Sequence, residues 1–400
     1  MRIRHSHILL YICGILFSTS CIEEIGFENE SFESALVIYA TITNEEKQQE
    51  VFLSRTYRFE DGEPTPESNA TITITGNGVI YEFEEVEPGN YVSKTAFKAE
   101  PNVEYQLLIN SSNGRTYSSS PSQLTQTTQI DALYVERETN DDGVNGMSIY
   151  VDSYDPTGNS QFYRYEYEET FKIIAPLWKD IDLFVISEDP FCLIGETERP
   201  EEQRICYRTE SSIDINQVST AGLTEDRLSR HLTRFVQSDD YKISHRYSLL
   251  VKQFVQSEAA HIFFKTLLNF SDDGSLFSQV QPGFVAGNII SEDNPKEKVI
   301  GFFEISSVST ERIFFNYHDY YPNSNIPPYI NECMIFTPAR LTEHPAKTEV
   351  CGPLINIVKA RILVYFDHAP HPDWPYRMVP RVCGDCTVLG RSEPPQFWVE

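Results

Sequence analysis

Apolar and polar residues alternate with a period of two over short runs of the chain from residue 35 onward. Residues 70–75 (ATITIT) are an example, because their apolar residues and threonines would occupy opposite faces of a strand. Runs of this kind, separated by Gly, Pro, Asn and Asp, occupy residues 35–43, 51–59, 70–75, 78–84, 90–94, 105–110 and 115–119. Short strands at this spacing predict an immunoglobulin- or transthyretin-like β-sandwich domain over residues 35–120.

Residues 118–129 (SSSPSQLTQTTQ) gather Ser, Pro and Gln, which predicts a linker after this domain. Alternation resumes beyond it, so we expect a larger β-rich domain over residues 130–400. This domain would begin with fibronectin-like strands and continue into an inserted loop at residues 176–202. Its further strands are expected at residues 243–255, 299–307, 311–317 and 356–366. The predicted fold class is therefore mainly β.

One or two short helices interrupt this pattern. Ser257 can cap a helix that begins with the acidic Glu258, and apolar residues follow at helical spacing. These apolar residues are Ala259, Phe263, Leu267 and Phe270. A weaker helix is predicted over residues 224–236, where Leu228, Leu232 and Phe235 would share one face.

The first twenty residues have the pattern of a targeting signal. A basic start is followed by ten apolar residues, 8–17 (ILLYICGILF), and by the small residues 18–20 (STS). Ten residues are about half of what a membrane-spanning helix needs. Since Cys21 comes next, we predict that residues 1–20 are a lipoprotein signal peptide and that Cys21 carries the lipid. The alternative is an ordinary secretory leader in which Cys21 has no role.

Residues 21–34 are acidic and lack periodicity, which predicts a tether between the lipid and the first domain. Glu23 and Glu24 follow the cysteine at once, and this resembles the surface-export signal of lipoproteins in the Bacteroidota. No later stretch is apolar for long enough to cross a bilayer. We therefore expect a lipid-anchored protein of the outer membrane that faces the cell surface.

The chain is strongly acidic, with 59 Asp and Glu against 32 Lys and Arg and a formal net charge of −27. Such a charge repels phosphate backbones, so we expect no binding of nucleic acid through a basic patch. The acidity is explained by solubility, with cation binding as the alternative.

Six cysteines follow Cys21, and an even number in an exported chain predicts disulfides rather than a metal site or a cofactor. They are Cys192, Cys206, Cys333, Cys351, Cys383 and Cys386. Six cysteines allow 15 connectivities. We expect nearest neighbours to pair, which gives Cys192 with Cys206, Cys333 with Cys351, and Cys383 with Cys386.

Other local patterns allow more than one interpretation. The C-x-x-C at residues 383–386 could be a redox pair or part of a zinc site, but a structural disulfide is favoured because no thioredoxin-like context surrounds it. His368 and His371 could bind a metal, but the prolines around them favour an exposed loop. The aromatic run at residues 317–322 and the three tryptophans could form stacking surfaces for a ligand or belong to the core.

Several segments resemble a lipoprotein family of the Bacteroidota known as the domain of unknown function, number 4249. They are YSLLV at 247–251, PGFVAGNI at 282–289, VIGFFE at 299–304, CGDCT at 383–387 and PQFW at 395–398, with the PGNY turn at 88–91 in the N-terminal half. The resemblance implies an outer-membrane lipoprotein, often encoded beside TonB-dependent transporters, with no established enzymatic activity. It supplies no functional residue beyond Cys21.

We therefore expect a non-catalytic binding or accessory subunit, with the membrane and a TonB-dependent transporter as partners. The alternatives are a surface hydrolase acting on glycans or peptides, and an adhesin or structural envelope protein.

Overall fold

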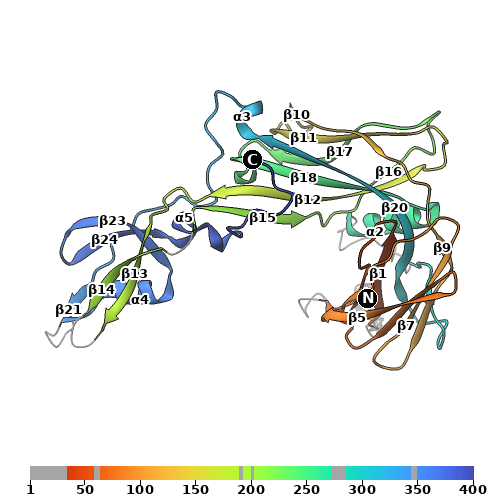
Figure 1. Ribbon diagram of the computed structural model, residues 1–400, viewed down its shortest axis with the longest axis horizontal. Coiled ribbons are helices and arrows are strands. Elements are labelled where there is room, and N and C mark those ends of the chain that lie inside the picture. The colour runs from red at the N-terminus through yellow and green to blue at the C-terminus, as the bar shows by residue number, and fades with distance from the viewer. Residues whose placement is uncertain (1–33, 58–63, 189–191, 200–201, 273–284, 344–348) are drawn as a thin grey trace, which may run out of the picture.

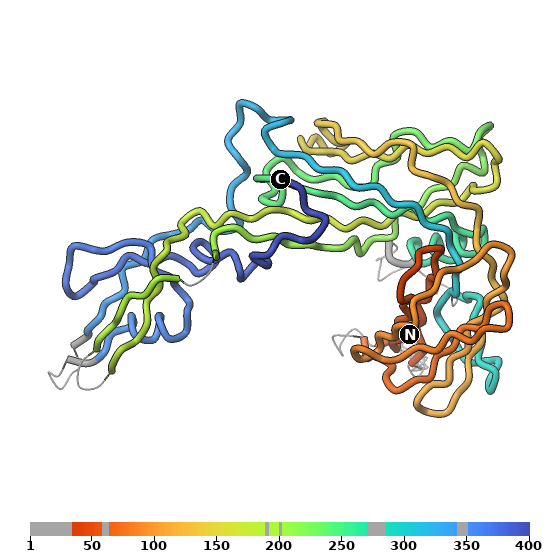
Figure 2. The backbone as a smooth tube through the Cα atoms, viewed as in Figure 1, coloured from red at the N-terminus to blue at the C-terminus, as the bar shows by residue number. Residues whose placement is uncertain are grey.

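The computed structural model describes residues 34–57, 64–188, 192–199, 202–272, 285–343 and 349–400. Its fold is mainly β, as the alternating pattern predicted. The molecule is an elongated arch with three parts, which we call the N-terminal unit, the central unit and the distal lobe (Figures 1 and 2). Cys21 and the leader lie outside the described residues. Within the described residues, every helix is too short or too polar to cross a membrane.

The N-terminal unit contains the strands that the first part of the sequence predicted. In β1, Leu36, Ile38, Ala40 and Ile42 point into the core while Tyr39 points outward. The strands of this part of the chain are β1(Leu36–Thr43), β2(Glu50–Arg55), β3(Thr65–Pro66), β4(Thr71–Gly76), β5(Val79–Glu87), β6(Asn90–Ser93), β7(Glu104–Asn110), β8(Thr116–Ser119) and β9(Ser122–Gln123).

Two further strands of this unit come from far along the chain. β19(Ile289–Ser291) pairs with β8, and the first half of β20(Val299–Asn316) pairs in parallel with β1. Residues 118–129, expected as a linker, include the end of β8 and all of β9. Thr125 in this segment accepts a hydrogen bond from the amide of Ser307 and thereby contacts β20.

β20 is the element that joins the N-terminal and central units. Its first half, up to Ser306, pairs with β1, and its second half, from Ser307, pairs antiparallel with β18(Arg246–Val255). The two strands predicted at residues 299–307 and 311–317 are therefore one strand. Because each half belongs to a different unit, the two units share one continuous sheet.

The central unit has two layers around a common core. A sheet of β10(Ile130–Thr139), β11(Asn145–Asp155) and β17(Asp226–Gln237) covers the larger sheet (Figure 1). The larger sheet contains β12(Phe162–Ile174), β15(Ile205–Ser211), β16(Asn216–Ser219), β18 and the second half of β20, and the 3-10 helix η2(Tyr241–Ile243) lies between β17 and β18. The short helix α3(Tyr317–Tyr320) follows β20.

The helix predicted over residues 224–236 is wrong, because this segment is the strand β17. Its pairing with β11 shifts register twice, and Arg230, which lies within the second shift, has a positive φ of 54°. Such bulges insert extra residues and break the alternation of a strand. Leu228, Leu232 and Phe235 imitate the spacing of a helix, but in the strand Leu228 is buried whereas Leu232 is 42% exposed.

The helix after Ser257 is confirmed as α2(Glu258–Asp272). The hydroxyl of Ser257 accepts a hydrogen bond from the amide of Ala260, so it caps the helix as expected. Ala260, Phe263 and Phe264 pack against Phe302 of β20, whereas Ala259 is exposed. The side chain of Phe270 lies outside the described residues.

The distal lobe contains short hairpins and helices at the other end of the arch (Figure 1). Its elements are β13(Ile181–Ser187), β14(Leu193–Glu198), β21(Leu341–Glu343), β22(Glu349–Cys351), α4(Pro353–Ala360), β23(Leu363–His371), β24(Trp374–Pro380), α5(Arg381–Gly384) and the 3-10 helix η3(Cys386–Val388). The expected loop at residues 176–202 thus contains the hairpin of β13 and β14.

The strand expected over residues 356–366 begins later, at Leu363, because α4 occupies the first part. Pro353 stands at the start of this helix, where its missing amide hydrogen costs nothing. Leu354, Ile355 and Val358 are buried at helical spacing, and Arg361 ends the helix in a left-handed conformation.

Candidate functional site

A cavity of about 210 Å³ lies in the corner where the N-terminal unit meets the central unit. Tyr39 of β1 and Phe52 of β2 line one wall, because alternate residues of both strands point away from the core. Their ring centroids are 6.3 Å apart. Glu166 of β12, with Lys252 and Phe254 of β18, lines the other wall. The corner therefore combines exposed aromatic rings with charged groups of both signs.

A buried ion pair lies behind this cavity and connects the two units. Arg164 of β12 and Glu304 of β20 are 3% and 2% exposed, and Nη2 of Arg164 is 3.6 Å from Oε2 of Glu304. Arg164 also pairs with Glu166 and donates a 3.4 Å hydrogen bond to the hydroxyl of Tyr39. Because Glu304 stands on the half of β20 that pairs with β1, the ion pair crosses the junction of the units.

Aromatic rings isolate the guanidinium of Arg164 from water. The ring centroids of Phe254 and Phe264 lie 4.4 and 5.1 Å from its Cζ. Glu304 makes no hydrogen bond of normal length to any described residue. A carboxylate in such surroundings is poorly solvated, and its charged form is disfavoured. Burial accordingly raises the pKa of Glu304 from 4.5 to about 7, although the charge of Arg164 opposes the shift.

This arrangement can hold or release a proton near neutral pH, because burial raises the pKa of Glu304 to about 7. The polar groups near this carboxyl group are Arg164, which also pairs with Glu166, and the side chain of Gln256. A perturbed carboxyl group in a junction indicates a site that affects structure or binding.

Sequence reasoning did not single out Arg164 or Glu304 as members of a site. One signal for Glu304 was present, because it is the only charged residue within the apolar run of residues 299–305. Arg164 gave no comparable signal, since charged residues surround it in β12.

Replacement of Glu304 by Gln should change how stability depends on pH. The folded-state pKa of Glu304 lies above 4.5, so the folded protein retains a proton that the unfolded chain releases between pH 4.5 and 7. The stability of the natural protein falls as pH rises through this window, and Glu304→Gln is free of that loss. As the pH is raised from 4.5 to 8, we expect the unfolding free energy of the variant to increase by on the order of 3 kcal/mol relative to that of the natural protein.

Urea unfolding of both proteins at the two pH values measures this difference. Glu168→Gln removes one negative charge from a partly exposed position on β12, the strand that carries Arg164, and serves as the control. If the difference in unfolding free energy between Glu304→Gln and the natural protein is the same at both pH values, the raised pKa of Glu304 is contradicted.

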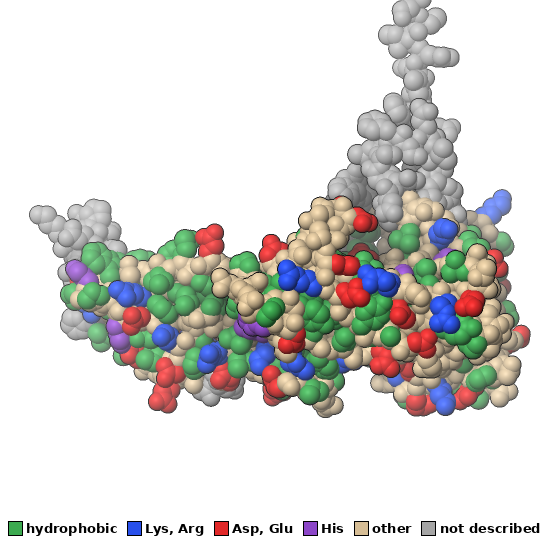
Figure 3. Space-filling model, turned by 90° about the horizontal axis from the view of Figure 1, so that it is seen from above, with side chains coloured by type: hydrophobic (Ala, Val, Ile, Leu, Met, Phe, Trp, Pro, Cys, Tyr) green, Lys and Arg blue, Asp and Glu red, His purple; other side chains and the backbone are tan. Residues whose placement is uncertain are grey.

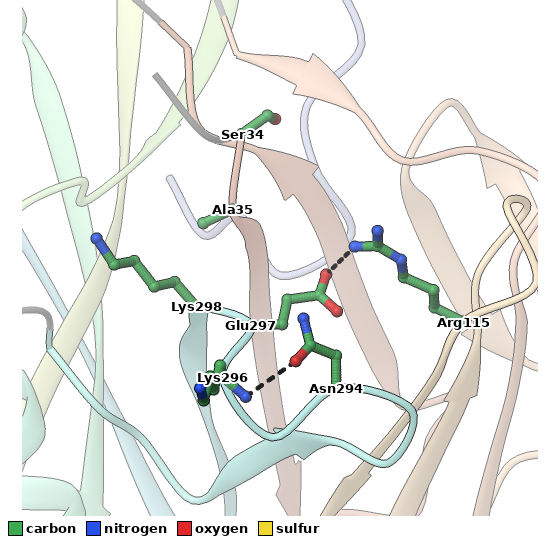
Figure 4. Close-up of a pocket in the computed structure, with 7 residues that line it drawn as sticks. All are labelled: Ser34, Ala35, Arg115, Asn294, Lys296, Glu297 and Lys298. Carbon is green, nitrogen blue, oxygen red and sulfur yellow. Dashed lines mark hydrogen bonds and ion pairs between the residues drawn. The ribbon is translucent and has the colours of Figure 1, made fainter. Parts of the chain in front are cut away.

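A second cavity, of about 390 Å³, lies at the end of the N-terminal unit where the described chain begins (Figure 4). Ser34 and Ala35 line it together with Arg115, Lys296 and Lys298. These cations form a small basic region on an acidic protein. The segment that carries Cys21 therefore joins the molecule beside exposed lysines.

The carboxylate of Glu297 in this cavity accepts hydrogen bonds from its neighbours. Its Oε1 accepts a hydrogen bond from Nη1 of Arg115 at 2.7 Å (Figure 4). It also accepts one from the hydroxyl of Tyr117 at 2.8 Å. Burial alone would raise the pKa of Glu297, but these hydrogen bonds outweigh it and lower the pKa.

The six cysteines form three disulfides, but the expected nearest-neighbour pairing is wrong. The bridges are Cys192–Cys351, Cys206–Cys386 and Cys333–Cys383, with Cα–Cα distances of 5.5, 5.6 and 5.6 Å. Cys192 precedes β14 in the distal lobe, whereas Cys206 belongs to β15 of the central unit. These neighbours in sequence therefore lie in different parts of the molecule.

Cys383 and Cys386 likewise lie in different short helices, α5 and η3, and each bonds a distant partner. The motif at residues 383–386 is therefore not a redox pair.

His368 and His371 belong to a hairpin, since both stand in β23. The ring of His371 lies tilted against that of Trp374 with centroids 4.3 Å apart, whereas Nε2 of His368 lies 3.6 Å from Glu196. The imidazoles thus have different neighbours. The described residues contain no group of three or more His, Cys, Asp or Glu that could hold a metal ion.

The aromatic run at residues 317–322 mostly joins the core. Tyr317 and Tyr321 are buried and stack on each other with centroids 4.7 Å apart. Trp398 packs against Tyr207 and Phe314, and only Trp374 of the three tryptophans is strongly exposed.

The distal lobe presents apolar side chains to solvent. Phe184 and Ile186 of β13 are 46% and 58% exposed, because they alternate with Leu183 and Val185, which pack into the lobe. Leu193 of β14 is exposed beside them. Figure 3 shows hydrophobic side chains in several patches over this end of the molecule. Such an exposed apolar surface is typical of a site that contacts another molecule.

Comparison with protein families gives a match over most of the chain. The model described as a domain of unknown function, DUF4249, matches residues 22–312. A comparison with curated proteins found no match.

Proposed function

The chain belongs to the DUF4249 family of domains of unknown function, and we propose that it acts as a surface-exposed lipoprotein of the outer membrane. In this proposal it is a non-catalytic binding or accessory subunit of a TonB-dependent transporter system. One observation carries the proposal: the end where the N-terminal segment joins and the apolar distal lobe lie at opposite ends of the arch (Figure 1).

The continuous structure between these two ends supports a role as a spacer that presents a binding surface. β20 extends through both the N-terminal and the central unit, so the two share backbone hydrogen bonds. The Cys206–Cys386 bridge then connects β15 of the central unit to the segment that leaves the distal lobe. An anchor at one end would therefore hold the apolar lobe away from the membrane.

The distal lobe has the properties of a surface that binds a protein. Its exposed side chains include Phe184, Ile186 and Trp374, and aromatic residues are enriched at protein interfaces. A disulfide between Cys192 and Cys351 connects two of its hairpins and limits the entropy lost on binding. These features favour a partner protein over a small substrate.

Replacement of Cys21 by Ala is expected to abolish labelling by a fatty-acid analogue and to release the protein from the membrane fraction. The reason is that the proposed lipid is bound to this thiol and a single acyl-cysteine is the only membrane contact in the proposal. Cys13→Ala removes a cysteine from the leader without touching Cys21, so it serves as the matched control and should be labelled normally.

Purification of the natural protein in mild detergent should yield a TonB-dependent transporter, and Cys21→Ala should not. Labelling that persists in Cys21→Ala would refute the lipid anchor. A natural protein that purifies from membranes without a transporter would refute the proposed partner and leave the anchor intact.

A further inference from the structure

β15 is an outer strand of the large sheet and has an open edge. Its neighbour on the inner side is β12, and β15 stands at the end of the strand order (Figure 1). The amide of Tyr207 donates to the carbonyl of Arg391 at 2.8 Å, and the amide of Arg391 donates back at 2.9 Å. The backbone groups of Tyr207 therefore point away from β12.

Thr209 must present its backbone groups on the same side as Tyr207. Alternate residues of an antiparallel strand direct their N–H and C=O groups to the same neighbour. Thr209 pairs with Thr170 of β12 in the non-hydrogen-bonded manner, and no described residue forms a backbone hydrogen bond with its outward groups. At Thr209 the edge thus has a backbone N–H donor and a C=O acceptor without a described backbone partner. They lie next to Tyr207, which already forms backbone hydrogen bonds with Arg391.

A cavity of about 590 Å³ lies along this edge. Tyr207, Arg208 and Thr209 form one side, and the C-terminal segment around Gly390 and Pro394 forms the other. Because this contact is antiparallel, the residue that would continue it opposite Thr209 is Leu389, and the amide of Leu389 instead donates to the carbonyl of Cys386 at 2.9 Å. The protein's own chain therefore leaves the edge open beyond a single bridge.

The far wall of the cavity is held in place by three kinds of contact. The Cys206–Cys386 disulfide fixes the start of the C-terminal segment. A Cβ at Gly390 would lie 2.4 Å from the carbonyl oxygen of Tyr207, so only glycine allows this close approach. At the end of the chain, Glu400 bonds Nζ of Lys172 at 2.8 Å. A fixed wall keeps the edge accessible and reduces the entropy that a ligand loses on binding.

We propose that the open edge of β15 at Thr209 binds an extended segment of a partner polypeptide as an added β-strand. Main-chain hydrogen bonds to the edge would supply the affinity in this mode of recognition, and the cavity would receive side chains. This inference rests on the proposed role as a binding subunit and adds the kind of contact that it makes. It is independent of the lipid at Cys21.

Thr209→Pro and Thr209→Val are the matched variants that test it. Both lose the 2.9 Å contact between the hydroxyls of Thr170 and Thr209. Only the proline removes the outward amide hydrogen, and it leaves the bonds of β15 to β12 intact because these come from the flanking residues. A difference in peptide affinity between the two variants therefore measures the contribution of the outward amide of residue 209.

The probe is a displayed library of extended peptides selected on the full-length protein purified in detergent. Selected peptides should bind Thr209→Val as they bind the natural protein and should bind Thr209→Pro about tenfold more weakly, because one main-chain hydrogen bond and the space for the strand are lost. Hydrogen exchange at the amide of Thr209 should slow when a selected peptide is added to the natural protein.

The hydrogen-exchange measurement uses the natural protein alone, so it tests strand addition at β15 even if Thr209→Pro fails to fold. The proposal is overturned if no peptide is enriched, if binding to a folded Thr209→Pro is unchanged, or if the amide of Thr209 gains no protection. None of these outcomes affects the Cys21 experiment, so the two proposals fail separately.

Discussion

A fragment of residues 35–120 is expected to lack a cooperative unfolding transition, although the sequence pattern predicts a domain of that span. The reason is that β19 and the first half of β20 complete its sheet and both come from beyond residue 285. These strands contribute four buried side chains to the core of the N-terminal unit, namely Ile289, Val299, Phe303 and Ile305.

The expected loss is large compared with the stability of a whole domain. Burial of one large apolar side chain contributes about 1.5–3 kcal/mol, so four of them contribute roughly 6–12 kcal/mol. A typical domain is stable by about 5–15 kcal/mol in total. Without these strands, β1 would also expose an unpaired edge that promotes aggregation.

A fusion of residues 35–120 to residues 285–306 through a flexible linker is the matched control. It restores both missing strands without the rest of the central unit, and it should recover a cooperative transition in thermal unfolding followed by circular dichroism. If the short fragment alone unfolds cooperatively and resists protease, the shared sheet is not needed for folding and this expectation is wrong.

Replacement of Cys206 and Cys386 by Ser is expected to destabilise the protein by about 4 kcal/mol. The two residues are 180 apart in sequence. With the other two bridges in place, the shortest covalent path between them contains about 35 residues, and closing a loop of that length gives about 4 kcal/mol in the chain-entropy model. The bridge also fixes the C-terminal segment against β15, so residues 386–400 should become open to protease.

The double replacement of Cys333 and Cys383 by Ser provides the comparison. This bridge joins the distal lobe to itself, since Cys383 belongs to a small core with Val364 and Val379. Its loss should raise hydrogen exchange in the distal lobe and leave β15 protected. Equal exchange in β15 for the two double variants, measured under non-reducing conditions, would argue against the assigned role of the Cys206–Cys386 bridge.

Local pattern in the sequence was sufficient for most of the elements and for the family. Alternation located the strands of the N-terminal unit, such as β4 and β7, because each has one face in a core and one in water. Capping by Ser257 and helical spacing located α2 in the same way. The residues of the leader, with Cys21, still stand as a prediction, and so do the domain limits.

The same local reasoning failed where two segments far apart in sequence decide the outcome. β17 was taken for a helix because Leu228, Leu232 and Phe235 recur at helical spacing, whereas in the assembled sheet Leu228 is buried and Leu232 is exposed. The buried pair of Arg164 and Glu304 was missed for a related reason, since β20 is covered on both faces and shows little alternation.

The sequence by itself determined that this chain is mainly β, belongs to its family and forms disulfides with all six of its later cysteines. Only the tertiary structure decided which cysteines pair, that β1 lies beside β20, and that Glu304 is buried against Arg164. The physical reason is that the period of a strand or helix follows from the chemistry of neighbouring residues. Pairing depends on which distant segments the fold brings within bonding distance, and no local pattern contains that information.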